Sequence, residues 1–254
     1  MKPAIVTIGV FDGVHLGHQV LLRQVVERAH ALDLPSFAVT FDPHPEQVLF
    51  PERKLMHLST SQERCEMMRA AGVDSVWVCP FTTELARLEP EDFIRLVAEH
   101  QPIAELWVGA DFALGRGRRG TIAVLAEIGS ALGWGLHMVP PYRHEGQTVS
   151  STAIRTLLAA GAVRGAADLL GRNYSVPCSV ASAGFVSVDP QRALPRPGPS
   201  YEVQLHQGAT TLDGHAQVQP DPGRVHVVPD MLEGVPAPSV RPGPARLEFV
   251  RRAD

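Results

Sequence analysis

Short apolar runs alternate with helical patterns over the first two thirds of the chain. In the helical segments apolar residues recur every three or four positions, as Val20, Leu21, Val25 and Ala29 do. Expected strands cover residues 4–10, 34–41, 73–81, 103–111 and 135–141, and expected helices cover 17–32, 59–72, 90–100, 121–133, 150–161 and 163–171. Continuously apolar strands separated by helices are typical of a parallel sheet covered on both faces. The pattern therefore predicts a doubly wound α/β domain over residues 1–174.

The pattern changes after Tyr174. Twelve of the 22 prolines lie between Pro177 and Pro244, and only short alternating runs remain. These runs cover residues 200–207, 215–220, 223–228 and 245–252. Period-two alternation broken by Pro and Gly predicts a small antiparallel β module over residues 175–254, with its prolines at edges and turns.

Composition narrows the class of protein. The hydrophobic share of 44% and the charged share of 20% are typical of a soluble globular protein. A net charge of −4 argues against a general nucleic-acid binder, and no apolar run approaches the ~20 residues that span a bilayer. The three cysteines are scattered without a CxxC pair, and the N-terminus lacks a cleavage signal, so we expect a cytoplasmic protein.

The first turn carries candidate chemistry. In "IGVFDGVHLGH" (8–18), glycines at 9, 13 and 17 let the backbone approach a ligand, and the helix start that follows favours an anion. Neither GxGxxG nor GxxxxGK[ST] is present. His15 and His18 stand in their place, three residues apart, and imidazoles can donate to phosphate oxygens, which suits phosphoryl or nucleotidyl transfer. Alternatively, one histidine caps the helix and the other lies on the surface; a zinc site would lack further ligands.

A second candidate phosphate site begins the helix expected at 150–161. The hydroxyls of Ser150, Ser151 and Thr152 and the free N–H groups there can hold phosphate. Arg155 follows within about one turn and can fork onto two oxygens. The alternative is an ordinary helix cap with a surface arginine.

Four segments in order resemble one family. They are "GVFDGVHLGH" (9–18), "TFDPHPEQVL" (40–49), "VGADFALGRGRRG" (108–120) and "VSSTAIRTLLAAGAVRGAADLLGRNY" (149–174). Together they resemble the FAD synthetase (FMN adenylyltransferase) module of the bacterial bifunctional riboflavin kinase/FAD synthetases, within the HxGH nucleotidyltransferase superfamily. The resemblance implies a Rossmann-like sheet of the HxGH nucleotidyltransferase type and in-line transfer of AMP from ATP to FMN, which gives FAD and pyrophosphate.

The resemblance also implies site residues. It implies catalytic roles for His15, His18 and Arg155. It implies ATP binding by Gly9, Phe11, Asp12, Gly17, Ser151 and Thr152. The flavin side is expected to comprise Phe41, His44, Pro45 and Asp111, because Pro43 and Pro45 stiffen a loop in which His44 and Phe41 can lie against a planar ring. Taken alone, this loop is equally a plain strand-to-helix turn.

The segment 108–120 departs from the family pattern. Arg116, Arg118 and Arg119 form a basic loop for the FMN phosphate or for pyrophosphate, unless it is a solvated charge run. The family position after "ADF" is usually basic and then aromatic, whereas this chain has Ala113 and Leu114. No protein metal site is expected, and Mg²⁺ would be recruited mainly by the substrate.

The resemblance weakens after residue 174. The family's kinase barrel carries a Pro-Thr-x-Asn core, which is missing here, while "RALPRPGPSYEVQL" (192–205) faintly echoes a later barrel strand. We therefore predict a shortened, degenerate riboflavin kinase-like barrel and FMN adenylylation without riboflavin phosphorylation. The alternatives are another HxGH enzyme that acts on a small phosphate ester, and a non-catalytic flavin- or nucleotide-binding protein.

Overall fold

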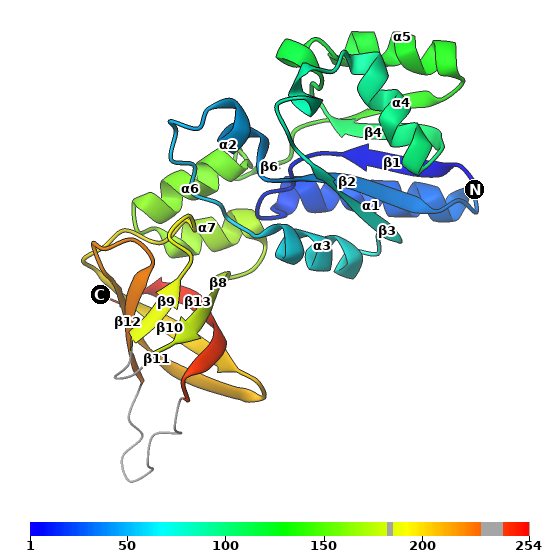
Figure 1. Cartoon of the computed structure of the whole chain (residues 1–254). Coiled ribbons are helices and arrows are strands. Elements are labelled where there is room, and N and C mark those ends of the chain that lie inside the picture. Colours follow the sequence, from blue (N-terminus) through cyan, green and yellow to red (C-terminus); the bar gives the residue numbers. More distant parts are fainter. Residues whose placement is uncertain (182–184, 230–240, 254) are drawn as a thin grey trace. The chain divides into compact units, whose positions relative to one another are not determined.

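The computed structural model describes residues 1–181, 185–229 and 241–253. The chain divides into two compact units (Figure 1). The first comprises Met1–Leu55 and Thr60–Thr148, and the second comprises Met56–Ser59 and Val149–Asp254. These units are defined by how tightly residues pack together and not by function. The domain boundary expected between residues 174 and 175 therefore stays a prediction.

The first unit contains the expected parallel sheet. Its five strands lie in the order β3-β2-β1-β4-β5, and every neighbouring pair is parallel. The strands are β1 (Ala4–Ile8), β2 (Ser36–Asp42), β3 (Ser75–Pro80), β4 (Ile103–Gly109) and β5 (Gly135–Val139). Because the order reverses direction at β1, the turn after β1 lies at the switch point where doubly wound sheets bind ligands.

Helices cover both faces of this sheet, as Figure 1 shows. One face carries α1 (Leu16–Ala31) and α3 (Ser61–Ala70), and the other carries α4 (Pro90–His100) and α5 (Ile122–Leu132). A capping box is present at the start of α3, where the Thr60 side chain accepts from the Glu63 N–H and the Glu63 side chain accepts from the Thr60 N–H. The doubly wound prediction is confirmed.

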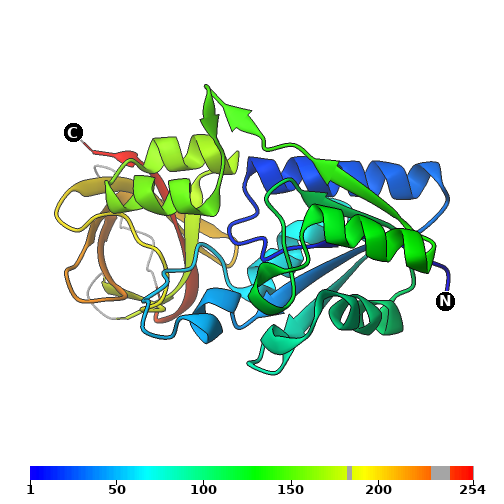
Figure 2. The same cartoon turned by 90° about the horizontal axis from the view of Figure 1, so that it is seen from above.

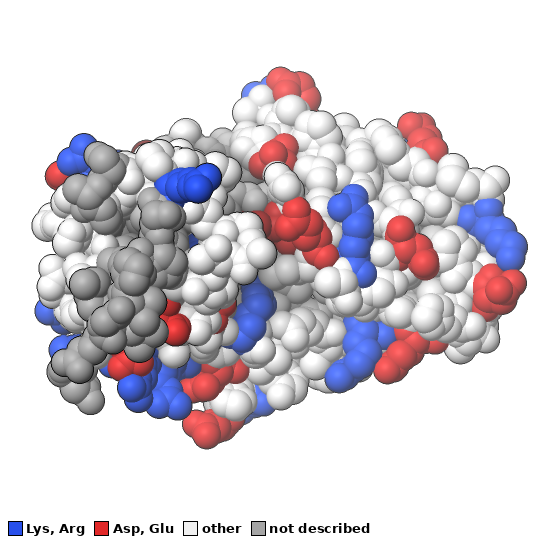
Figure 3. All heavy atoms as spheres, turned by 90° about the horizontal axis from the view of Figure 1, so that it is seen from below, with Lys and Arg blue, Asp and Glu red and all other residues white. Residues whose placement is uncertain are grey.

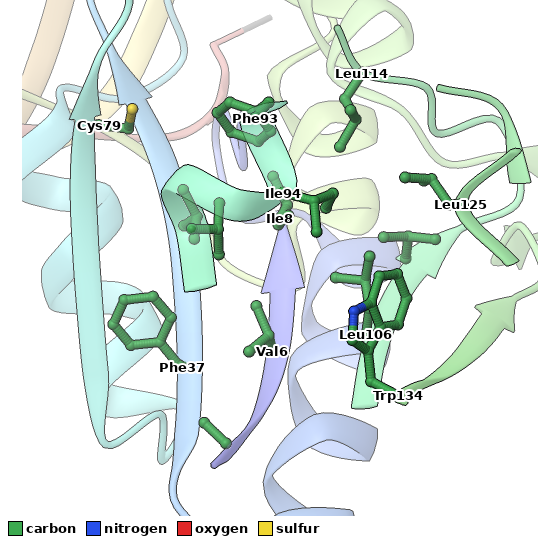
Figure 4. Close-up of a cluster of buried hydrophobic side chains, with 14 of the residues drawn as sticks. Val6, Ile8, Phe37, Cys79, Phe93, Ile94, Leu106, Leu114, Leu125 and Trp134 are labelled. Carbon is green, nitrogen blue, oxygen red and sulfur yellow. The ribbon is translucent and has the colours of Figure 1, made fainter. Parts of the chain in front are cut away.

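Each face of the sheet has its own core, because successive side chains of a strand point to opposite faces. In β1, Val6 and Ile8 point to the α4–α5 side, while Ile5 belongs to the cluster under α1 and α3. Figure 4 shows Val6 and Ile8 beside Leu106 and below Ile94 of α4. These layers hold the strand ends rigidly, so the turns that leave them have fixed starting points.

The sequence pattern did not predict five short elements of this unit. They are the helix α2 (Pro45–Leu49), the hairpin of β6 (Arg143–His144) with β7 (Gln147–Thr148), and the 3₁₀ turns η1 (Leu85–Arg87) and η2 (Arg116–Arg118). Each is too short for a hydrophobic period to develop.

The second unit combines two helices with a barrel, seen end-on in Figure 2. The helices are α6 (Ser151–Ala159) and α7 (Val163–Leu170). The barrel closes in the order β10-β11-β12-β9-β8-β13, with every pair antiparallel. Its strands are β8 (Tyr174–Val180), β9 (Phe185–Val188), β10 (Ser200–Gln207), β11 (Thr210–Val218), β12 (Arg224–Pro229) and β13 (Gly243–Arg252). The expected antiparallel β module is confirmed and is a closed barrel.

Besides Pro229, which ends β12, two barrel prolines belong to strands. Pro177 of β8 pairs with β13, but β9 pairs only with Cys178–Val180. Pro244 of β13 pairs with β8, but β10 reaches only as far as Arg246. Both prolines therefore have a strand on one side only, an edge-like place where a missing N–H is tolerated. Residues 235–240 of the proline-rich stretch lie outside the described residues.

Charges of both signs are interspersed on the face drawn in Figure 3. In the first unit several form exposed pairs, such as Lys2 with Asp33 at 3.0 Å and Arg95 with Glu91 at 2.6 Å. No helix in the described part of the chain is long and apolar enough to cross a membrane.

Candidate active site

The turn between β1 and α1 holds the two histidines. Its backbone is left-handed at Phe11 (φ 55°), Gly13 (φ 78°) and Val14 (φ 38°). A β-branched residue with positive φ is an outlier, and such strain is concentrated at functional sites. The turn persists because its surroundings fix it: Val14 N–H donates to the Phe11 carbonyl at 3.0 Å, and the Gln19 amide donates to the Val14 carbonyl at 2.9 Å.

His15 caps α1, as the alternative interpretation of the sequence allowed for one histidine. Its Nδ1 accepts from the His18 backbone N–H at 3.3 Å. His18 is not a simple surface residue: it is partly buried, its ring stacks on that of His15, and the Phe11 ring meets it edge-on at 5.1 Å. The two side chains therefore form one unit at the helix start.

The electrostatics of this pair favour a neutral His18. Burial lowers the pKa of His18 well below its usual value, and the neighbouring His15 lowers it further. Its Nδ1 is buried and has no hydrogen-bond partner among the described residues. A bound anion would oppose both effects, and the role of His18 towards phosphate stays a prediction.

Packing alone restricts which residues can replace the glycines of this turn. A Cβ at Gly17 would lie 3.3 Å from the His15 ring, and one at Gly9 would lie 3.1 Å from the Phe11 ring. Phe11 and Asp12 are buried. The ATP contacts implied for Gly9, Phe11, Asp12 and Gly17 stay predictions.

The loop after β2 connects a strand to a short helix, as the alternative interpretation of the sequence allowed. His44 is the N-cap of α2, with its Nδ1 accepting from the Glu46 N–H at 3.1 Å, and Pro45 is the first helical residue. Phe41 is buried and meets Phe81 edge-on at 5.5 Å. These side chains therefore already make contacts within the protein, and their flavin contacts stay predictions.

The basic loop after β4 folds back on the start of α4. Arg116 and Arg119 lie 3.8 and 3.6 Å from the same Glu89 oxygen, and Arg118 donates to the Asp111 carbonyl at 2.9 Å. Gly115 is left-handed (φ 71°), and a Cβ there would meet the Pro90 backbone. Glu89 was not expected, because nothing in the sequence separates it from other exposed acids. Whether these arginines contact phosphate stays a prediction.

The second phosphate motif lies in the second unit. Ser150 caps α6 by accepting from the Ala153 N–H at 3.2 Å, and Ser151 and Thr152 open the helix. Arg155 donates through Nε to the Met56 carbonyl at 2.8 Å. The segment Met56–Ser59 is itself held by pairing between His57 and Arg192. Sequence reasoning missed Met56 because a backbone acceptor leaves no pattern.

The described residues contain no group of three or more His, Cys, Asp and Glu that could hold a metal ion. The three cysteines are buried, and burial raises the pKa of the Cys79 and Cys178 thiols to about 11.

Comparison with known proteins gives the family. Residues 1–153 match the family model described as FAD synthetase. The chain belongs to the FAD synthetase family. A bifunctional riboflavin kinase/FMN adenylyltransferase of Escherichia coli (strain K12) is 32% identical over 173 residues, which cover 68% of this chain and 55% of that protein. The chain thus spans about half the length of such relatives.

The likeness extends into the barrel. The protein of the same name from Pseudomonas fluorescens is 33% identical over 214 residues, which cover 84% of this chain and 67% of that protein. An alignment of that length must reach beyond β8. A crystal structure named as a macrolide-efflux protein from Streptococcus pneumoniae covers 100% of this chain and 86% of its own, with a TM-score of 0.85 and 22% identity, and shows the fold alone.

Proposed function

We propose that this chain is an FMN adenylyltransferase, which transfers AMP from ATP to FMN and gives FAD and pyrophosphate. The observation that carries the proposal is the stacked His15–His18 pair at the start of α1, in a chain whose residues 1–153 match the FAD synthetase family. A helix start with two imidazoles suits an anionic centre whose charge is spread over phosphate oxygens.

The reaction is an in-line displacement. A phosphate oxygen of FMN attacks the α-phosphorus of ATP, the bond from that phosphorus to the α,β-bridging oxygen breaks, and pyrophosphate leaves with the electron pair. The protein's task is to position the groups and stabilise the charge. In this proposal His18 and Arg155 stabilise the transition state, while His15, Ser151 and Thr152 hold the triphosphate.

Other residues bind the two substrates. Gly9, Phe11, Asp12 and Gly17 contribute to the nucleotide site. Phe41, His44, Pro45 and Asp111 form the flavin side, and Arg116, Arg118 and Arg119 face the FMN phosphate or the leaving pyrophosphate. The pairing of Arg116 and Arg119 with exposed Glu89 supports this role, since exposed pairs are weak enough for a phosphate to displace.

No covalent enzyme intermediate is needed. The buried cysteines with their raised thiol pKa values are poor sources of thiolate, which agrees with direct transfer. In this proposal Mg²⁺ arrives mainly with ATP, and the bound ion would neutralise phosphate charge. We further propose that the protein works in a reducing, cytoplasmic setting without nucleic acid.

The barrel is proposed to lack riboflavin kinase activity. The absence of the Pro-Thr-x-Asn core from the sequence supports this, while the closed six-stranded barrel supports descent from a kinase module. The chain would then depend on FMN made elsewhere.

Chromatography of reaction products tests the proposal. The purified chain is incubated with Mg–ATP and either FMN or riboflavin. We expect FAD from FMN and no product from riboflavin. His18→Ala should abolish FAD formation, whereas the matched control His30→Ala, on the exposed far end of α1, should retain it. FMN formed from riboflavin would refute the proposal that the barrel lacks riboflavin kinase activity. Flavin binding without any product would favour a non-catalytic binding protein.

A further inference from the structure

A positively charged side chain is buried beneath the turns that leave β1 and β2. Arg64 of α3 is only 2% exposed and is among the largest fully buried side chains of the described residues. Burying a guanidinium is costly unless polar partners surround it. Its partners therefore indicate why the chain keeps a charge here.

The partners come from both turns. Arg64 Nη2 donates to the Phe41 carbonyl at 2.6 Å, one residue before Asp42 and the loop to α2. Burial lowers the pKa of Arg64, while attraction to Asp12 and then to Asp42 opposes this most strongly. Asp12, in the histidine turn, is itself only 1% exposed. One guanidinium thus donates to the main chain near the end of β2, and the buried Asp12 carboxylate of the first turn is the charge that attracts it most strongly.

Further bonds join the start of the histidine turn to β2. Gly9 N–H donates to the Val39 carbonyl at 3.0 Å, and Thr40 Oγ1 donates to the Val10 carbonyl at 2.9 Å. These bonds hold the strand ends, and Arg64 continues the connection outward to Asp12 and Phe41. A backbone strained at Phe11 and Val14 needs such support to keep one conformation.

We propose that Arg64 is a positioning residue for adenylyl transfer: it fixes the His15–His18 turn relative to the loop that carries Phe41 and His44. This inference rests on the proposed function for its catalytic consequence. Arg64 touches neither substrate in this scheme. It acts through Asp12, whose carboxylate anchors the turn from inside, and through the Phe41 carbonyl, which sets where the second loop begins.

Arg64→Lys tests this role while keeping the charge. A lysine ammonium cannot reproduce the planar fork, so it cannot satisfy the Phe41 carbonyl and face both carboxylates in the same geometry. Arg28→Lys is the matched control: Arg28 also forks onto a carboxylate, Glu105, but from the last turn of α1. Both variants are compared for thermal midpoint, kcat, KM for ATP and FMN, and the pKa of His18 by NMR.

We expect both variants to lower the thermal midpoint, and only Arg64→Lys to lower kcat, by about tenfold, because small misplacements of reacting groups are costly. The pKa of His18 should rise towards its usual value only in Arg64→Lys, because a loosened turn exposes the ring while the total charge is unchanged. Equal kcat and equal His18 pKa in the two variants would overturn the proposal. A wild-type chain without transferase activity would refute the proposed function alone, since the His18 pKa still decides the role of Arg64.

Discussion

The imidazole rings of His15 and His18 lie face to face at the start of α1, with centroids 3.6 Å apart and planes inclined by 14°. Two protonated imidazoles at that separation would repel each other strongly. The stack is therefore stable when at least one ring is neutral, and the lowered pKa of His18 identifies that ring. In the proposed function, bound phosphate would supply the negative charge that allows protonation.

The first prediction concerns this ring. In the ligand-free protein the pKa of His18 should lie well below the ordinary ~6.5, and it should rise when a non-reactive ATP analogue binds. His15→Ala should also raise it, because the neighbouring His15 ring lowers the pKa of His18. Histidine-resolved NMR titration measures all three values. A His18 pKa at or above that of a free histidine would contradict the described stack.

The same shift has a consequence for stability. A histidine whose folded pKa is lowered binds its proton more readily when unfolded, so the free energy of unfolding falls as pH drops below ~6.5. His18→Phe should lose this part of the pH dependence. Denaturant unfolding of both proteins between neutral and acidic pH gives the comparison, and parallel curves would be the contrary result.

Gly17→Ala separates activity from stability. A Cβ at Gly17 would lie 3.3 Å from the His15 ring, yet alanine is the better helix former by about 1 kcal/mol. We expect a loss in kcat/KM of about tenfold, because the His15 ring must move, with little change in thermal midpoint. Gly165→Ala in α7 is the control, since its Cβ would approach the flexible Leu157 side chain at the same 3.3 Å. Equal activities would show that the ring has room to adjust.

Arg155→Lys should slow the reaction more than it weakens binding. Arg155 uses Nε to hold the Met56 carbonyl, and a lysine cannot make that bond while presenting a fork to phosphate. The expected loss in kcat is on the order of 10- to 100-fold, with smaller changes in KM. Steady-state kinetics measure this, with Arg164→Lys on the exposed face of α7 as control. A change confined to KM would place Arg155 in ground-state binding only.

A further prediction concerns stability and rests on Glu105, which lies near the amino end of β4. Its carboxylate accepts from Arg28 at 2.6 Å and from the Trp107 indole at 2.9 Å, and the Arg28 hydrogen bond is the main reason that its pKa is lowered. Since the folded pKa is lowered, this stability is present above the unfolded value near ~4.3 and disappears as pH falls below it.

Glu105→Gln should therefore lower the thermal midpoint at neutral pH by several degrees, with the difference shrinking in acid. Its kcat should stay close to that of the wild type, because Glu105 lies near the amino end of β4. Thermal melts at several pH values and one kinetic assay test both statements. A pH-independent difference in midpoint would show that the carboxylate charge is not what stabilises the fold.

Part of the fold could be predicted because it depends only on short stretches of the sequence. The five apolar strands and their helices follow from hydrophobic period, and the histidine turn follows from the spacing of Gly9, His15, Gly17 and His18. The closure of the barrel could not be predicted in this way. It depends on pairs such as Tyr174 with Phe249, which are far apart in the sequence, and on the four-residue strand β9.

The buried supports of the site escaped prediction for a different reason. An arginine such as Arg64 on a helix is normally a surface residue, and only the packing of α3 shows that it lies inside. His44 as an N-cap was hidden because α2 has only five residues. Sequence patterns indicate which chemistry is present, whereas long-range packing decides which side chains carry it and which hold it in place.

Transfer of an adenylyl group from ATP to FMN is the activity that we propose for this chain. The most direct measurement follows the label of α-phosphate-labelled ATP when the protein is incubated with FMN, beside a reaction with γ-phosphate-labelled ATP and riboflavin. We predict that the α-label appears in FAD and that the γ-label never enters a flavin. An α-label that stays out of flavin, with the protein folded and both substrates present, would contradict the account.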